Sequence, residues 1–275
     1  MKKAITAITF FDIVFLLLLS VSGSIGGIAG NVIYYFAFAV PIFLGIVFLR
    51  CNKDEEAKPV LLKILPDGKS FGYTLPVIAP FISLVFAVSF LTSLILTKLG
   101  FSETTDVSGN IFSVIVKHAV LPAFFEEALF RFIPLVLLIP YSKKNALAVS
   151  TVMFAAVHCS LFQIPYALLA SFILSLAALA TGSIFPCILI HFLNNVTSIL
   201  FMRYQGVSYF NLIFFSSLAL LCVISFVFLF LKREKYKTIF KELKEDKCNV
   251  EFTLATVMFV AMTLVIGALN LWMSL

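Results

Sequence analysis

Residues 208–231 read SYFNLIFFSSLALLCVISFVFLFL, a run of 24 residues without a charged side chain. At about 1.5 Å per residue, a helix of this length crosses the roughly 30 Å of hydrocarbon in a bilayer. Apolar runs near this length recur along the chain, whereas the strands of a membrane β-barrel alternate apolar and polar residues over about ten positions. The sequence therefore predicts an all-α, polytopic transmembrane helical bundle, with residues 1–275 forming a single integral membrane domain.

The composition of the whole chain excludes the soluble classes. Hydrophobic residues make up 61% of the 275 residues and charged residues 12%, whereas an ordinary soluble domain has about 45–50% and about 25%. The 12 glycines and 10 prolines are too few for a collagen-like or disordered chain, and the five cysteines are too scattered for a disulfide scaffold.

The distribution of Lys and Arg predicts the topology. We expect about 8–9 spans, and the nine that we place lie near residues 4–21, 31–49, 74–97, 111–139, 145–161, 164–180, 184–202, 208–231 and 252–273. With the N-terminus in the cytoplasm, 16 of the 20 basic residues fall in cytoplasmic segments and only Lys98 and Arg203 fall outside, which is the positive-inside pattern. The net charge of +6 thus needs no nucleic-acid partner.

This pattern predicts a multi-pass protein of the cell membrane, most simply a bacterial plasma membrane, with membrane lipid as a partner. The basic segment 232–250 contains Ile239, Phe240 and Leu243, and we expect it to form a short amphipathic helix on the inner leaflet.

Ionisable residues inside the predicted spans are the first place to look for function, because each costs about 2.5–3.5 kcal/mol to insert. Most of them, together with two asparagines, gather in the fourth, fifth and seventh spans. These polar residues are Lys117, His118, Glu126, Glu127, Arg131, His158, His191, Asn194 and Asn195. Asp12 stands apart in the first span, and we expect it near the inner interface rather than in the bundle interior.

Helical spacing sorts this cluster. Glu127 and Arg131 are four residues apart and share a helix face, so they can form an ion pair, whereas Glu126 is rotated by about 100° and remains a spare carboxylate. The same spacing pairs Phe154 with His158 and His191 with Asn195.

Two prolines, Pro122 and Pro134, bracket the glutamates. A kink at these positions would open a pocket in which irregular backbone is tolerated. A carboxylate, two imidazoles and an amide that converge there can carry out hydrolysis, with a general base for water and hydrogen-bond donors for the developing oxyanion.

These residues also carry a family resemblance. The order Glu-Glu-x-x-x-Arg, Phe-x-x-x-His and His-x-x-x-Asn resembles the CPBP intramembrane proteases, which comprise the type II CAAX prenyl endopeptidases and the bacterial Abi and bacteriocin-processing relatives. The resemblance covers residues 122 to about 203, within a catalytic core that we place at 109–205. It implies an endopeptidase in which Glu126 and His158 activate water, His191 and Asn195 stabilise the oxyanion, and Glu127, Arg131 and Phe154 support the site.

Several alternatives stay open from the sequence. Glu126, His158 and His191 are an acceptable zinc-ligand set, although the amide of Asn195 favours metal-independent chemistry. By spacing alone Asn194 competes with Asn195, and we expect His118 to have a packing role. The expected substrate is a membrane-associated or lipid-proximal peptide or protein. The rival functions are a non-catalytic immunity or scaffold protein and, with less support, an ion-coupled transporter.

Overall fold

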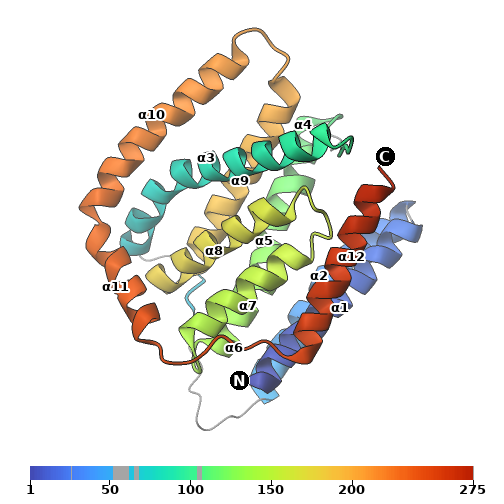
Figure 1. The fold of residues 1–275 in the computed structure, drawn as a ribbon, viewed down its shortest axis with the longest axis vertical. Helices are drawn as coiled ribbons and strands as arrows, with labels where there is room; N and C mark the ends of the chain where they lie inside the picture. The colour runs from blue at the N-terminus through green and yellow to red at the C-terminus, as the bar shows by residue number, and fades with distance from the viewer. Residues whose placement is uncertain (26, 52–61, 65–67, 104–106, 275) are drawn as a thin grey trace.

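The computed structural model describes residues 1–25, 27–51, 62–64, 68–103 and 107–274 (Figure 1). Within these ranges, seven helices are long and apolar enough to cross a membrane. They are α1 (Lys2–Ile25), α2 (Gly27–Cys51), α3 (Gly68–Lys98), α8 (Ile164–Thr181), α9 (Phe185–Tyr204), α10 (Phe210–Leu231) and α12 (Leu254–Trp272). The predicted all-α polytopic bundle is therefore confirmed.

The two remaining predicted spans are irregular or short. Residues 111–138 form one continuous helical run in which α4 (Ile111–Ile115), α5 (Leu121–Glu127) and α6 (Ile133–Leu138) alternate with π-helical turns η1 (Val116–Val120) and η2 (Ala128–Phe132). Helix α7 (Lys143–Ala156) has 14 residues and ends five residues before the predicted end at 161. Its length is about 21 Å, so it stops short of a full bilayer crossing.

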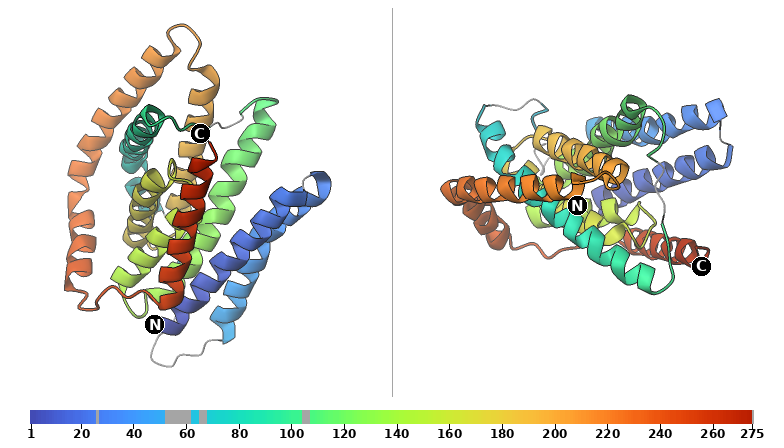
Figure 2. Two further views of the ribbon diagram at one scale, coloured as in Figure 1. Left: turned by 45° about the vertical axis from the view of Figure 1, so that its right-hand side comes forward. Right: turned by 90° about the horizontal axis from the view of Figure 1, so that it is seen from above.

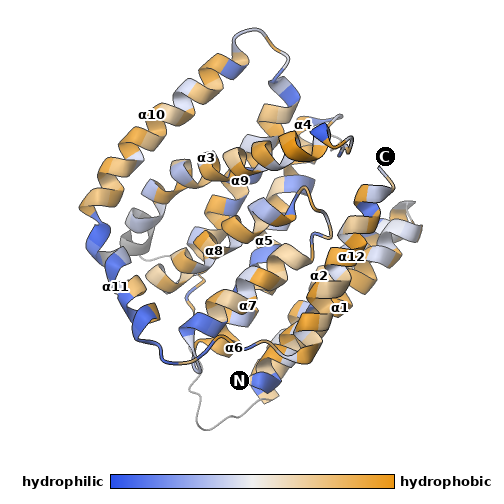
Figure 3. Cartoon of the chain, in the orientation of Figure 1, coloured by the Kyte–Doolittle hydropathy of each residue, from blue (hydrophilic) through white to orange (hydrophobic). Residues whose placement is uncertain are grey.

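The polar parts of the bundle gather at one end. Figure 1 shows the N-terminus, the start of α7 and helix α11 (Arg233–Glu245) at this end, and Figure 3 shows that α11 is its most hydrophilic element. From the same end α12 runs upward beside α1, which pairs with α2 as an antiparallel hairpin (Figures 1 and 2). The basic residues at the N-terminus, at the start of α7 and in α11, which the sequence assigns to the cytoplasm, therefore lie at the same end.

Polar side chains replace the hydrogen bonds that two prolines remove. Pro122 and Pro134 have no N–H, so the carbonyl groups four residues earlier lose their helical donors. The Nδ2 of Asn195, on α9, donates to His118 O at 3.2 Å, and the Oγ of Ser150, on α7, donates to Phe130 O at 2.6 Å. Both π-helical turns lie just before these prolines. Side chains of neighbouring helices therefore donate hydrogen bonds to backbone carbonyl groups where the helical pattern is interrupted.

The structure corrects the expectation for Asp12. Its side chain is 1% exposed, on the face of α1 that also buries Ile5, Ile8, Thr9 and Phe15. This face turns inward because α1 packs against α2, α6, α7 and α12. Asp12 therefore lies in the bundle interior and not at the inner interface.

Helix α11 is amphipathic as expected, but protein covers part of its apolar face. Ile239 and Leu243 are buried against Leu147 of α7 and Ala180 of α8, whereas Phe240 is 55% exposed. Polar contacts hold the same segment to the start of α7: Lys143 pairs with Glu242, and Ser142 Oγ donates to Asp246 Oδ2 at 2.8 Å. The sequence predicts that lipid covers the apolar face of this helix. This expectation needs correction, since part of that face packs against the start of α7 and the end of α8.

Candidate functional site

One pocket collects polar side chains from helices that are far apart in the sequence. It encloses about 320 Å³, within the range of small-ligand sites. Its lining comes from α2, α3, η1, α5, α8, α9 and the end of α7, and consists of Tyr34, Phe81, Lys117, His118, Pro122, Glu126, Phe154, His158, Tyr166, Ala170, Leu174, His191, Asn194 and Asn195. The four residues assigned catalytic roles by the resemblance, Glu126, His158, His191 and Asn195, all line it.

His191 lies between the two adjacent glutamates. Its Nδ1 is 2.7 Å from Glu127 Oε1, and its Nε2 is 3.9 Å from Glu126 Oε2. Glu127 is fully buried, whereas the Glu126 side chain is 21% exposed. A carboxylate only accepts hydrogen bonds, so the short contact places a proton on Nδ1 and leaves Nε2 facing Glu126.

Arg131 completes a buried charge network behind the pocket. Its NH1 is 3.3 Å from Glu127 Oε1, and both side chains have no exposed surface, as the spacing predicts. The guanidinium lies 3.7 Å from the centre of the Phe154 ring, a cation–π contact. Glu127 thus contacts Arg131 and His191 at once, and Phe154 separates the guanidinium from the pocket.

The end of α7 sets the orientation of His158. The helix stops at Ala156, so nearby carbonyl groups lack the N–H groups of a further turn. His158 Nδ1 lies 2.8 Å from Phe154 O, and since a carbonyl only accepts, Nδ1 carries the proton. The remaining ring nitrogen, Nε2, is therefore the one available for chemistry in the neutral form.

The two asparagines form a short chain of amides along α9. Asn194 Nδ2 donates to Asn195 Oδ1 at 3.3 Å, and Asn195 Nδ2 donates to His118 O at 3.2 Å. An amide nitrogen has two hydrogens, so Asn195 keeps one for a ligand. The Oδ1 of Asn194 is buried without a hydrogen bond to a described residue. Both asparagines line the pocket, so neither helical spacing nor this geometry separates them.

The lining includes residues that sequence reasoning missed or placed elsewhere. Tyr34 and Tyr166 gave no signal, because a single tyrosine in an apolar span is common. His118 lines the pocket instead of serving only in packing, and Lys117 lies beside it. Their position eight or nine residues before Glu126, a little over two turns away, was the available signal.

The candidate metal ligands do not form a coordination shell. In the part of the chain that the structure describes, no group of three or more His, Cys, Asp or Glu side chains is arranged to hold a metal ion. The Nδ1 atoms of His158 and His191 already have partners within 2.8 Å, so their Nε2 atoms are the ring nitrogens that remain for a ligand. A metal ion at Glu126, His158 and His191 stays a prediction, and no catalytic step is derived through one.

Comparison with known proteins agrees with the motifs. Residues 108–197 match the family model described as type II CAAX prenyl endopeptidase Rce1-like. No curated protein matches the chain, and neither does any solved structure. The matched segment runs from just before α4 into α9 and contains all three motifs. The resemblance is thus confirmed over residues 108–197, which are similar to the type II CAAX prenyl endopeptidase Rce1-like family.

Proposed function

We propose that this protein is an intramembrane endopeptidase that hydrolyses a peptide bond in a membrane-associated peptide, with Glu126 as the general base. The observation that carries the proposal is the position of His191 between Glu126 and Glu127 in a pocket that Asn195 and His158 also line. The Rce1-like match at residues 108–197 supports the same class of reaction.

The first step is attack by water. The 3.9 Å between Glu126 Oε2 and His191 Nε2 lets one water lie within hydrogen-bond distance of both atoms. Glu126 takes one proton from this water while the Nε2 of His158 accepts the other hydrogen bond. The water oxygen then bonds to the carbonyl carbon of the substrate, and the π electrons of the carbonyl move onto its oxygen.

The second step requires donors for the oxyanion. Asn195 supplies the N–H that it does not use on His118 O. His191 supplies an Nε2–H when it is doubly protonated, and the Glu127 carboxylate beside Nδ1 is the counter-charge that this form requires. Such preorganised donors are worth about 10²- to 10³-fold each in other hydrolases.

In the last step the carbon–nitrogen bond breaks as the oxyanion collapses back to a carbonyl. The leaving nitrogen takes the proton that Glu126 holds, which regenerates the carboxylate. The products are a new carboxyl terminus and a new amino terminus, and one water is consumed.

The test begins with Glu126→Gln, which removes the base at nearly constant volume. Membranes containing this variant are cross-linked, and the captured peptide is identified by mass spectrometry. Incubation of that peptide with wild-type protein in ¹⁸O-water should place one ¹⁸O in the new carboxyl terminus, and Glu126→Gln should be slower by about 10²- to 10⁴-fold.

Glu103→Gln is the matched control, since Glu103 is an exposed glutamate that does not line the pocket and that accepts hydrogen bonds from Ser160 and Gln163. It should cleave at the wild-type rate. Equal cleavage by wild type and Glu126→Gln would move the base to another residue. Capture without any cleavage by wild type would favour the non-catalytic scaffold.

A further inference from the structure

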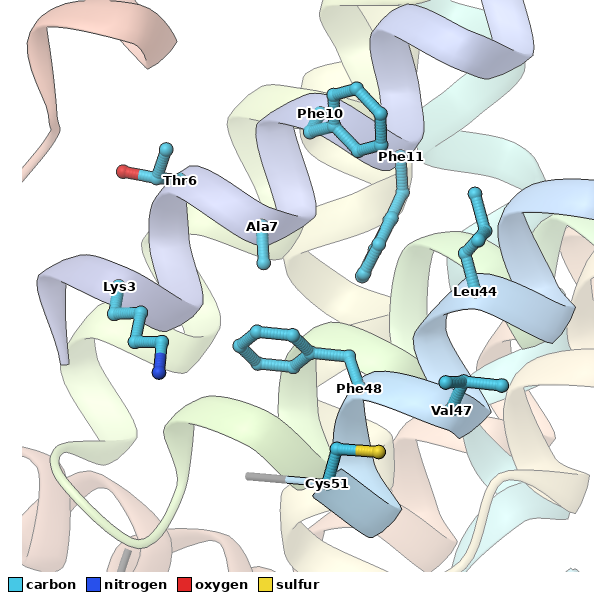
Figure 4. Close-up of a pocket in the computed structure, with 9 residues that line it drawn as sticks. All are labelled: Lys3, Thr6, Ala7, Phe10, Phe11, Leu44, Val47, Phe48 and Cys51. Carbon is cyan, nitrogen blue, oxygen red and sulfur yellow. The ribbon is translucent and has the colours of Figure 1, made fainter. Parts of the chain in front are cut away.

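A second cavity lies between α1 and α2, away from the site described above. Figure 4 shows its lining, which consists of Lys3, Thr6, Ala7, Phe10, Phe11, Leu44, Val47, Phe48 and Cys51. The cavity is larger than the candidate active site, at about 690 Å³. We propose that this groove binds one anionic phospholipid of the inner leaflet, with an acyl chain between α1 and α2 and the phosphate on Lys3.

The groove is a consequence of helical spacing. The lining residues of α2 recur three or four positions apart, and those of α1 do the same, so each helix contributes one stripe. The floor is an edge-to-face pair, Phe11 and Phe48, with ring centres 6.1 Å apart. Phe10 and Val47 are 54% and 39% exposed, so the groove opens towards the lipid and not towards the bundle.

The groove has the length of a lipid tail within one leaflet. From Lys3 to Phe11 it extends about 12 Å along α1, which compares with roughly 15 Å for half of the hydrocarbon core. Its apolar end, with Phe10 and Leu44, lies further from the N-terminus, and Lys3 and Cys51 lie at the end near the N-terminus (Figure 4). An acyl chain therefore fits along the groove with its headgroup at Lys3.

Charge selects the headgroup. Lys3 is exposed, and none of the described ion pairs or hydrogen bonds engages its ammonium group. Among the described residues at the ends of α1 and α2, the charged side chains are Lys2, Lys3 and Arg50, so the described part of this end is net positive. An anionic phosphate headgroup matches both features, since each Lys near an anionic surface adds about a fivefold preference.

The experiment measures lipid retention on the purified full-length protein. Protein reconstituted in nanodiscs of equal phosphatidylglycerol and phosphatidylcholine is released from them and analysed by native mass spectrometry. Wild type should retain one phosphatidylglycerol. Lys3→Gln should lower its preference over phosphatidylcholine by about fivefold, whereas Lys2→Gln, whose side chain does not line the groove, should keep the preference.

A second variant tests the groove itself. Ala7→Phe places a ring in the space of the acyl chain and should abolish retention of either lipid. Equal losses in Lys3→Gln and Lys2→Gln would overturn the headgroup assignment, and so would equal retention of both lipids by wild type. Retention that survives Ala7→Phe would place the lipid elsewhere, and a wild-type dimer that Ala7→Phe dissociates would replace the lipid by a second copy of the chain.

Discussion

Replacing Glu127 by Gln removes the negative charge that contacts both the Arg131 guanidinium and the Nδ1 of His191. At 3.3 Å from Arg131 NH1, and with an effective dielectric constant of about 20, the lost attraction is about 5 kcal/mol. Measured losses for one member of a buried ion pair are about 3–5 kcal/mol. We therefore expect Glu127→Gln to fold with greatly reduced stability, and its melting temperature in detergent to fall by about 10 °C.

The glutamine oxygen can still accept from His191 Nδ1, so the imidazole orientation survives in part. The counter-charge for a doubly protonated His191 is lost, and peptide cleavage should fall as well. The assay pairs a thermal melt with a cleavage rate for four variants: Glu127→Gln, Arg131→Met, the double variant and Glu245→Gln. Glu245→Gln is the control, because Glu245 Oε1 lies 3.8 Å from Lys241 Nζ in an exposed ion pair. The loss of this exposed pair should cost less than about 1 kcal/mol.

The double variant decides the interpretation. Because it removes the unpaired guanidinium, it should recover part of the stability that Glu127→Gln loses, with a non-additive coupling between the two sites. If the double variant is as unstable as the sum of the single ones, the ion pair is not the source of the loss and the argument from burial fails.

Three further outcomes follow from the fold. Ser150→Ala leaves Phe130 O without a donor and should destabilise the protein by about 1–3 kcal/mol in a thermal melt, whereas an unchanged melt would mean that another donor serves this carbonyl. Burial alone would raise the pKa of Asp246, but hydrogen bonds from Lys144 N and Ser142 Oγ outweigh it and hold the pKa below its ordinary 3.8. The carboxylate should therefore stabilise the α11–α7 contact above pH 3.8 and lose that effect as the pH falls through the lower folded value. The protection factors of the α11 amides, which are corrected for the intrinsic pH dependence of exchange, should therefore fall in acid for wild type and show no such fall in Asp246→Asn. Cys51 and Cys248 are exposed, and both should react with a membrane-impermeant thiol reagent from the cytoplasmic side; labelling from opposite sides would refute the nine-pass order.

The sequence predicts the passes well because hydropathy and charge act locally. Seven of the nine predicted spans form long helices where they are expected, whereas π-helical turns interrupt the span at 111–139 and α7 ends at Ala156. The Glu127–Arg131 pair follows from a spacing of four residues. The same reasoning misplaces Asp12, since composition does not reveal which face of α1 meets other helices. It also misplaces Ile239 and Leu243, because an apolar stripe looks alike whether lipid or protein covers it.

The contact between Glu127 and His191 shows a second limit. Spacing places two residues on one face of a helix, but the rotation of α9 against α5 decides which glutamate each imidazole nitrogen meets. That rotation depends in part on the bond between Asn195 and His118 O. This bond uses the carbonyl that Pro122 deprives of its helical donor, so a tertiary contact contributes to what the local pattern leaves undetermined.

The carbonyl groups opened by Pro122 and Pro134 have a consequence for biogenesis. The segment 111–138 emerges from the ribosome before Ser150 and Asn195, which supply its missing donors. In lipid each unsatisfied carbonyl costs several kcal/mol. We therefore expect this segment to enter the membrane with two carbonyl groups that lack their side-chain donors, and to gain those hydrogen bonds when α7 and α9 pack against it. The pocket and the backbone that shapes it are thus assembled in the same event, and a nascent chain that carries the glutamates alone has no preformed site to act on its neighbours.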